Sequence, residues 1–277
     1  MAKGIGLIGN FKGKVGNMVG YKLSDSNTGN SQGIRVYQPI VKNPKTSAQA
    51  EQRAKLAPIN ATYRALKMVI DRGNEGLPYG NKSRLAWLKQ AFKAQNMPWI
   101  IKGGVVAYPV GCPLTKGSLA GVVTEVGDDV FKISCSGVKQ ESTFATIGAV
   151  STALKAAYPN LKDGDQVTVV IVGQMGGTLA SDIFSFVIDA TSKEATSKFD
   201  PDANKIIVNS DLYKIGGAVI ISREGANGEH LRSTTSVQIN ADALGDRPYD
   251  APSKTAAVES YMSSAAANGD WAEESIQ

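Results

Sequence analysis

The sequence predicts an α+β fold: an N-terminal β-hairpin plus helices, followed by a mainly antiparallel β-sandwich or barrel with one crossover helix. Apolar residues recur at helical spacing between residues 47 and 95. From about residue 105 the chain changes to short Val- and Ile-rich runs bounded by Gly, Asp and Asn. One Ala-rich segment, residues 143–157, interrupts these runs where a sandwich would cross between its sheets. With 277 residues, the chain can bury one large core or two modest ones.

These patterns divide the chain into four segments. We expect a Gly-rich basic arm and β-hairpin at 1–45, a helical segment at 46–104, a β-sandwich-like domain at 105–245, and a partly mobile C-terminal extension at 246–277.

The N-terminal segment combines glycine with lysine. Residues 1–15 contain four glycines among three lysines, which is typical of an arm that becomes ordered against a partner. They do not form a phosphate-binding P-loop, because the Gly-Lys pair at 13–14 is followed by valine. The runs Val15–Leu23 and Gly33–Ile40 flank the turn-rich stretch SDSNTGNSQ, and together they predict a hairpin with a long loop.

A first helix is expected from about Ser47. Thr46 and Gln49 fit a capping box, in which Thr46 accepts a hydrogen bond from the Gln49 amide and the Gln49 side chain bonds back. Pro58 either kinks one long helix or starts a second one. The apolar spacing continues to Gly73, which we interpret as a C-cap.

A further helix is predicted over Lys82–Gln95, with Asn81 or Ser83 as its N-cap. Its apolar members are Leu85, Trp87, Leu88 and Phe92.

The second half of the chain contains about seven strand-like runs separated by turn residues, the pattern of an antiparallel sandwich or barrel. They are Leu119–Val126, Val130–Cys135, Gln166–Val172, Ile183–Ala190, Lys205–Asn209, Ala218–Arg223 and Thr234–Ile239.

The C-terminal extension has few apolar anchors. We expect at most a final strand near Ala257–Met262 and then a mobile tail. Trp271 is unusual in such a tail, and it either anchors the tail in a partner's pocket or packs on its own domain.

Charge is distributed unevenly along the chain. Residues 1–110 hold 17 Lys+Arg and four Asp+Glu, a net charge of +13, whereas residues 111–277 hold 13 and 21, a net charge of −8. One interpretation is that the basic half faces a polyanion or the acidic surface of a neighbour, as in head-to-tail self-association. The other is that the charges only solvate two unrelated surfaces.

We predict no catalytic site, no metal and no cofactor, and therefore not an enzyme. The one catalytic arrangement that the sequence leaves open is a pair of carboxylates that meet from distant positions on a β scaffold. Cys112, Cys135 and His230 are scattered, without the close spacing of a metal site, and indicate two buried thiols and a surface histidine. No nucleophile elbow is present. The neighbouring acids Asp128 and Asp129, and Asp163 with Asp165, lie in short turns, where such residues usually hydrogen-bond to the turn backbone. No apolar run approaches the ~18 residues of a membrane span and no signal peptide is recognisable, so we expect synthesis in a cytoplasm without membrane insertion.

Candidate contacts to nucleic acid or to an acidic partner are the basic residues of the first segment, which can bind phosphates without reading bases. They are Lys3, Lys12, Lys14, Lys22, Arg35, Lys42 and Lys45. Candidate aromatic anchors are Phe11, Tyr21 and Tyr37, which can also stack on unpaired bases, together with Trp271.

Several strings of the first 125 residues resemble an uncharacterised protein family found in Bacteroidota and in their phages and mobile elements. These strings are the opening MAKG, then GKVGNMVG, IRVYQP, VKNPKTSAQAEQRAKL and CPLTKGSLAGV, and NPKTSAQAEQR is the most specific of them. The resemblance implies a structural role in a phage virion, as a capsid or capsid-associated subunit. The partners would be copies of the chain, other virion proteins or packaged nucleic acid. The alternative is a non-sequence-specific nucleic-acid-binding accessory protein.

Overall fold

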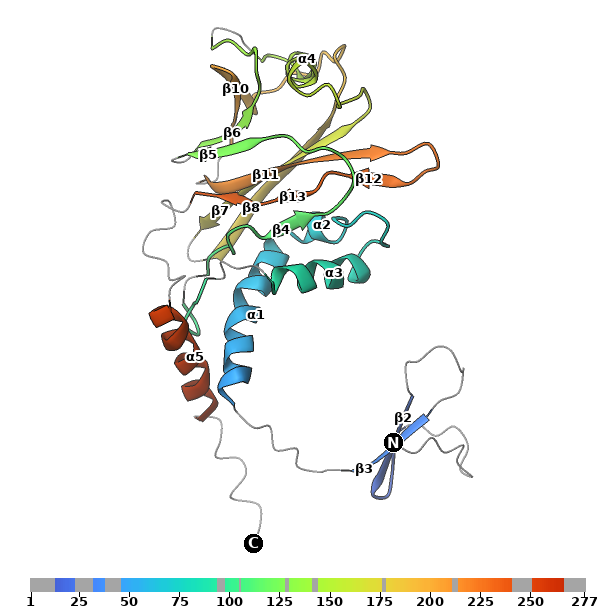
Figure 1. The fold of residues 1–277 in the computed structure, drawn as a ribbon, viewed down its shortest axis with the longest axis vertical. Coiled ribbons are helices and arrows are strands. Elements are labelled where there is room, and N and C mark those ends of the chain that lie inside the picture. Colours follow the sequence, from blue (N-terminus) through green and yellow to red (C-terminus); the bar gives the residue numbers. More distant parts are fainter. Residues whose placement is uncertain are drawn as a thin grey trace. The chain divides into compact units, whose positions relative to one another are not determined.

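A computed structural model of the chain describes residues 13–22, 32–37, 46–93, 98–104, 106–127, 130–140, 144–175, 178–210, 214–240 and 251–266. The chain forms two compact units, Met1–Pro44 and Lys45–Gln277, which we call the N-terminal unit and the body. Helices and antiparallel sheets are both present, so the predicted α+β class is confirmed (Figure 1).

The N-terminal unit contains a three-stranded antiparallel sheet. Its strands are β1 (Gly13–Val15), β2 (Met18–Lys22) and β3 (Gln32–Val36), in the order β1-β2-β3. The predicted hairpin is the β2-β3 pair. The prediction of one continuous strand over Val15–Leu23 was wrong, because Gly16 has a φ of 57° and turns the chain tightly between β1 and β2.

The body is built around two antiparallel sheets. One has the order β12-β11-β7-β8, with β14 also pairing with β11, and the other has the order β5-β6-β10-β9. A two-stranded sheet joins β4 and β13. The strands are β4 (Pro113–Thr115), β5 (Thr124–Gly127), β6 (Val130–Ser134), β7 (Gln166–Met175), β8 (Thr178–Val187), β9 (Phe199–Asp202), β10 (Lys205–Val208), β11 (Lys214–Glu224), β12 (His230–Arg232), β13 (Thr235–Ser236) and β14 (Gln238–Ile239).

The first hydrophobic core lies between these two sheets. Phe131 and Ile133 of β6 face Val167 and Val169 of β7 in one buried cluster. Helix α4 (Ile147–Ala157) closes this core with residues such as Leu154, and it connects β6 of one sheet to β7 of the other. The predicted crossover helix is therefore present.

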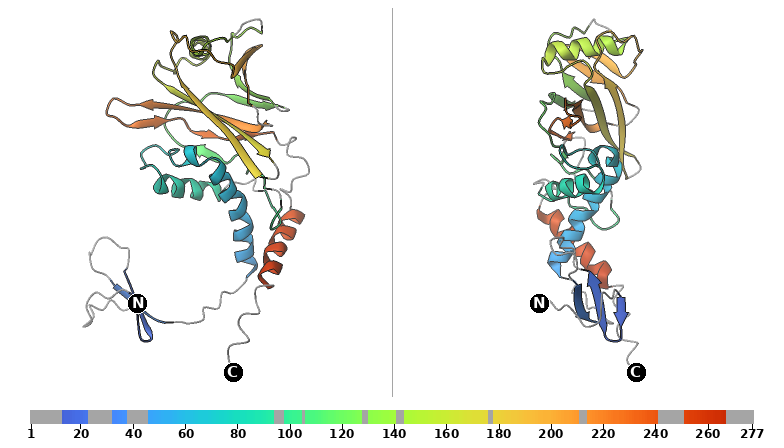
Figure 2. Two further views of the ribbon diagram at one scale, coloured as in Figure 1. Left: turned by 180° about the vertical axis from the view of Figure 1, so that it is seen from behind. Right: turned by 90° about the vertical axis from the view of Figure 1, so that its right-hand side faces the viewer.

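The second core lies on the opposite face of the β7-containing sheet, against three helices (Figure 2). These are α1 (Ser47–Ala65), α2 (Lys67–Ile70) and α3 (Asn81–Ala91). Val170 and Val172 of β7 point into this core, so that residues 169–173 of β7 are buried on both faces. A continuous Val/Ile run is typical of a strand covered on both sides. The helices and the strands thus share one body.

The start of α1 confirms half of the predicted capping box. Thr46 Oγ1 accepts a hydrogen bond from the Gln49 amide at 3.3 Å, but Gln49 Oε1 has no partner among the described residues. Helix α1 runs through Pro58 for 19 residues, so the proline does not start a second helix.

Two predicted caps were wrong. Gly73 does not cap a helix; a Cβ atom there would lie 2.6 Å from the Leu114 carbonyl oxygen, so this glycine permits close backbone packing. The N-cap of α3 is Gly80, at φ 87°. Ser83 lies inside α3 instead, where its buried hydroxyl donates to the Ile70 carbonyl at 2.8 Å.

The C-terminal extension contains a helix, α5 (Ala251–Ala266), so the prediction of a strand near Ala257–Met262 was wrong. Alanine has a high helix propensity, and α5 packs its buried Ala257 and Val258 along α1. Lys254 forms an ion pair with Glu51 of α1 at 3.1 Å. None of the described helices is long and apolar enough to cross a membrane.

Candidate functional site

The predicted contact residues fall into two groups. Lys14, Tyr21, Lys22, Arg35 and Tyr37 lie on or next to the three-stranded sheet. The others lie outside the described residues: Lys3, Phe11, Lys12, Lys42, Lys45 and Trp271, together with the predicted mobile tail at 267–277.

One face of the N-terminal sheet carries cations. Lys14, Val19 and Arg35 are directly paired across the three strands, so Lys14 and Arg35 lie on the same face, and both are exposed. The Lys14 ammonium lies 3.6 Å from the centre of the Tyr37 ring, a cation–π contact. The Tyr37 amide donates to the Asn17 carbonyl at 2.8 Å and ties the end of β3 to the β1-β2 turn.

The other face of this sheet exposes apolar side chains. Met18 and Val36 are directly paired, one position along from the Val19 row, and they are 41% and 65% exposed. Strand β1 pairs only with β2, and β3 pairs only with β2, among the residues that the structure describes. The described strands of this 44-residue unit are only three to five residues long, and a unit of this size has room for only a small core.

The net charge of the chain is located in one of its two units. Six of the 30 Lys+Arg and one of the 25 Asp+Glu lie in residues 1–44, so the N-terminal unit carries +5 and the body has 24 of each. The whole formal excess of positive charge therefore belongs to the N-terminal unit, and the body is formally neutral.

The body has a groove next to the end of α2, on the sheet that contains β7. It encloses about 200 Å³ and is lined by Met68 and Arg72 from the α2 region, by Thr168 of β7 and Ser185 of β8, and by Arg232 of β12. Thr168 and Ile220 lie on the face of this sheet that packs against α1–α3 elsewhere, so the groove is a part of this face that the helices leave open.

Tyr79 lies between the two arginines of this region. The guanidinium carbons of Arg72 and Arg232 are 5.7 and 5.9 Å from the centre of its ring, which is the range of cation–π contacts. His230 also stacks against Tyr79, with a centroid distance of 5.7 Å. His230 is exposed, as predicted for a surface histidine. Tyr79 itself is half-exposed beside the groove, in contact with Arg72, Arg232 and His230.

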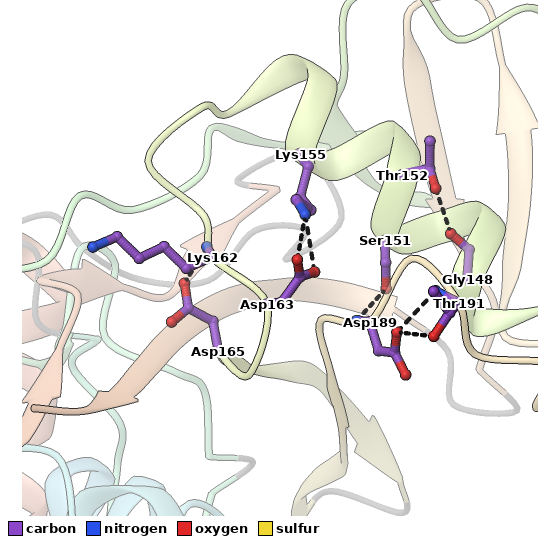
Figure 3. Close-up of polar contacts among 9 residues, drawn as sticks. All are labelled: Gly148, Ser151, Thr152, Lys155, Lys162, Asp163, Asp165, Asp189 and Thr191. Atoms are coloured by element: carbon purple, nitrogen blue, oxygen red, sulfur yellow. Dashed lines mark hydrogen bonds and ion pairs between the residues drawn. The ribbon is translucent and has the colours of Figure 1, made fainter.

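Of the neighbouring acids, Asp163 and Asp165 are engaged in structural contacts (Figure 3), and Asp128 and Asp129 lie outside the described residues. Asp163 forms an ion pair with Lys155 of α4 at 2.8 Å. Asp165 accepts the Lys162 amide at 2.8 Å, which is turn chemistry as predicted. However, Asp165 is also only 1% exposed and is paired with Arg223, which the sequence did not indicate. The same figure shows Ser151 of α4 accepting the Asp189 amide at 3.2 Å.

The two cysteines are free and buried, as predicted. Burial raises the pKa of the Cys112 thiol to about 12 and that of Cys135 to about 11, so both remain protonated and unreactive at neutral pH. Within the described ranges, no group of three or more His, Cys, Asp or Glu residues is placed to hold a metal ion.

Glu75 joins segments that are distant in the sequence. Its carboxylate accepts the Ser118 amide at 2.9 Å, the Ser118 hydroxyl at 2.9 Å and the Arg232 amide at 3.0 Å. Burial opposes ionisation of Glu75, but the Arg232 and Ser118 donors outweigh it and hold the pKa below its ordinary value.

A pH-dependent prediction follows for Glu75. Because its folded-state pKa is lowered, its contribution to stability is complete above the unfolded-state pKa of ~4.3 and is lost as pH falls from there through the folded value. In Glu75→Gln, the free energy of unfolding is expected to be lower at pH 7 and to fall less steeply than that of the wild type below about pH 5. Urea titrations between pH 3 and pH 7 measure this difference. Glu194→Gln, the same substitution at an exposed acid, is the control.

Comparison of the chain with protein-family models, with curated proteins and with solved structures finds no match.

Proposed function

We propose that the chain is a structural subunit of a phage virion, a capsid or capsid-associated protein, which assembles through its N-terminal unit. The observation that carries the proposal is the three-stranded sheet, a separate unit with exposed Met18 and Val36 on one face. A unit this small has room for only a small core, so burial of this face against a partner would add stability. The resemblance of NPKTSAQAEQR and the neighbouring strings to a phage-associated family supports the virion role.

The chemistry of the sheet indicates what kind of contact it would make. Strands that pair on one side only can extend a sheet of a neighbouring subunit. Exposed apolar residues gain stability when such a contact removes them from water. The cations of the opposite face and the +5 charge of the unit fit an acidic partner surface or packaged nucleic acid.

A pair of matched substitutions tests the assembly role. Val36→Glu places a charge on the apolar face of the sheet, and we expect it to weaken self-association or binding to co-purified virion proteins about tenfold or more. Val123→Glu is the control, because Val123 is 62% exposed, close to the 65% of Val36, but belongs to the body. Sedimentation velocity over a concentration series and negative-stain imaging measure the effect.

Three outcomes contradict the proposal. Equal assembly of wild type, Val36→Glu and Val123→Glu would remove the N-terminal unit from the assembly contact. Absence of the chain from purified particles, quantified by mass spectrometry, would exclude a virion component. Unchanged oligomers together with DNA binding that falls steeply with salt would instead identify a nucleic-acid-binding accessory protein.

A further inference from the structure

The groove beside Tyr79 combines an apolar wall with two cations. Met68, 76% exposed, and Ile220 supply apolar atoms, while Thr168 and Ser185 supply hydroxyl groups. Its volume of about 200 Å³ exceeds the ~150 Å³ of a protein cavity that takes up benzene, so the groove has room for one large aromatic side chain.

The two arginines of the groove differ from Arg223 in their partners, because Arg223 forms an ion pair with a buried carboxylate. Arg223 has its guanidinium bonded to both oxygens of Asp165. Among the ion pairs of the described residues none involves Arg72 or Arg232, although the charge of Arg232 helps to lower the pKa of nearby Glu75, and both arginines lie beside Tyr79. Two guanidinium groups that are held in place and have no carboxylate in direct contact form a recognition surface for carboxylates.

The last eleven residues of the chain have the complementary composition. Residues 267–277 contain no Lys or Arg, and their acids Asp270, Glu273 and Glu274 surround a single aromatic residue, Trp271. A tryptophan flanked by carboxylates matches a groove that offers an aromatic-sized space and two arginines.

We propose that this groove binds the acidic, Trp271-containing C-terminal segment of a second copy of the chain. This proposal rests on the proposed function, because both require that copies of the chain bind one another. The tail contact would be a second contact, besides the one made by the N-terminal sheet. The resulting contact is head-to-tail: the tail of one copy occupies the groove of the next.

The length of the tail explains why the occupant belongs to another copy. Lys254 pairs with Glu51 near the start of α1, and α5 continues from there to end near that end of α1, away from α2 (Figure 1). The groove lies beyond the other end of α1, which at 19 residues is ~28 Å long. Trp271 is five residues beyond Ala266, and five extended residues span at most ~18 Å. The Trp271 of the same copy therefore falls short of the groove.

A direct binding experiment tests the groove. The probe is a fluorescein-labelled synthetic peptide of residues 267–277, and the receptor is the full chain carrying Trp271→Ala, so that its own tail does not compete. We expect saturable binding by fluorescence anisotropy. The Arg72→Glu, Arg232→Glu double variant should weaken it at least about tenfold, and Trp271→Ala in the peptide about thirtyfold. The double variant Arg53→Glu, Arg64→Glu is the control, because it makes the same charge change at exposed positions of α1.

Complementation between copies tests the head-to-tail geometry. A chain with Arg72→Glu and Arg232→Glu keeps an intact tail, and a chain with Trp271→Ala keeps an intact groove. Neither should make the tail contact alone, so the weight-average mass of an equimolar mixture, measured by light scattering, should exceed that of either chain by itself at the same total concentration. In case the arginine variants do not fold, a benzoylphenylalanine at the Trp271 position of the peptide should crosslink to the unaltered groove near Met68.

Each remaining outcome overturns the inference. No saturable peptide binding, a crosslink outside the groove, or equal binding by the double arginine variant and its control would show that the tail does not bind there. Loss of single-stranded DNA binding in that variant without any peptide binding would identify a nucleic-acid surface. The Val36→Glu experiment is independent of all these measurements, so failure of the tail contact and failure of the proposed assembly role are distinguishable.

Discussion

Arg223→Met is expected to lower the free energy of unfolding of the body by about 3–5 kcal/mol, because it leaves the Asp165 carboxylate buried without its counter-ion. Arg223 Nε lies 2.6 Å from Oδ1 of Asp165 and Nη2 lies 2.7 Å from Oδ2. Nη2 also donates to the Asn160 carbonyl at 2.8 Å. The side chain therefore fastens the loop between α4 and β7 to the end of β11. Methionine keeps the apolar stem of arginine but supplies none of these donors.

Urea denaturation followed by circular dichroism measures the loss, and Lys155→Met is the matched control. Lys155 forms an ion pair with Asp163 in the same region, but the Asp163 side chain is 64% exposed, and such surface pairs contribute about 1 kcal/mol or less. Adding Asp165→Asn to Arg223→Met should recover part of the loss, because it removes the buried charge. Similar losses for Arg223→Met and Lys155→Met would show that the buried pair is no more important than a surface one.

The parts of the fold that are governed by local rules could be predicted from the sequence. Thr46 caps α1 through the Gln49 amide as the capping pattern indicated. The crossover helix α4 lies within the predicted residues 143–157, and Thr146 caps it by accepting the Ala149 amide at 3.3 Å. In these places, residues close in the sequence provide both the signal and the interaction.

The predictions that were wrong or missing concern elements whose structure depends on residues distant in the sequence. β9 (Phe199–Asp202) was missed because its sequence is FDPD, and proline and aspartate are rare in strands; it is tolerated at the edge of its sheet, next to β10. The helix α5 was missed because its apolar residues are few, and what holds it is the surface of α1 about 200 residues earlier. Asp165 was predicted only as a turn residue, because its ion-pair partner Arg223 lies 58 positions later in the sequence.

The same reasoning explains which candidate site residues the sequence revealed. Lys14, Arg35 and Tyr37 belong to one short basic segment, and a composition count is enough to find them. Arg72 and Arg232 are 160 positions apart, and neither lies in a recognisable motif. Only the pairing of β12 with β11 brings Arg232 to the face on which α2 ends, so no local pattern could have indicated the groove.

Trp87→Ala is expected to lower the free energy of unfolding of the body by about 3–5 kcal/mol, the range for truncating a buried aromatic side chain. Trp87 of α3 is 2% exposed and belongs to the core that α1–α3 share with β7 and β11. Its indole N–H donates to the Pro113 carbonyl at 2.7 Å, and its ring lies 6.1 Å from that of Tyr63. Alanine would leave a cavity and an unpaired carbonyl group at once.

Leu85→Ala supplies the control on the same helix. Leu85 was predicted as an apolar member of this helix together with Trp87, yet it is 49% exposed, so its truncation is expected to change stability by about 0.5 kcal/mol or less. The comparison tests whether the helices and the sheets unfold together. If they share a core, Trp87→Ala shifts one cooperative transition that tryptophan fluorescence and far-ultraviolet circular dichroism report alike. If the helical segment folds separately from the sheets, the two probes diverge in Trp87→Ala and the β-sheet signal keeps its wild-type midpoint.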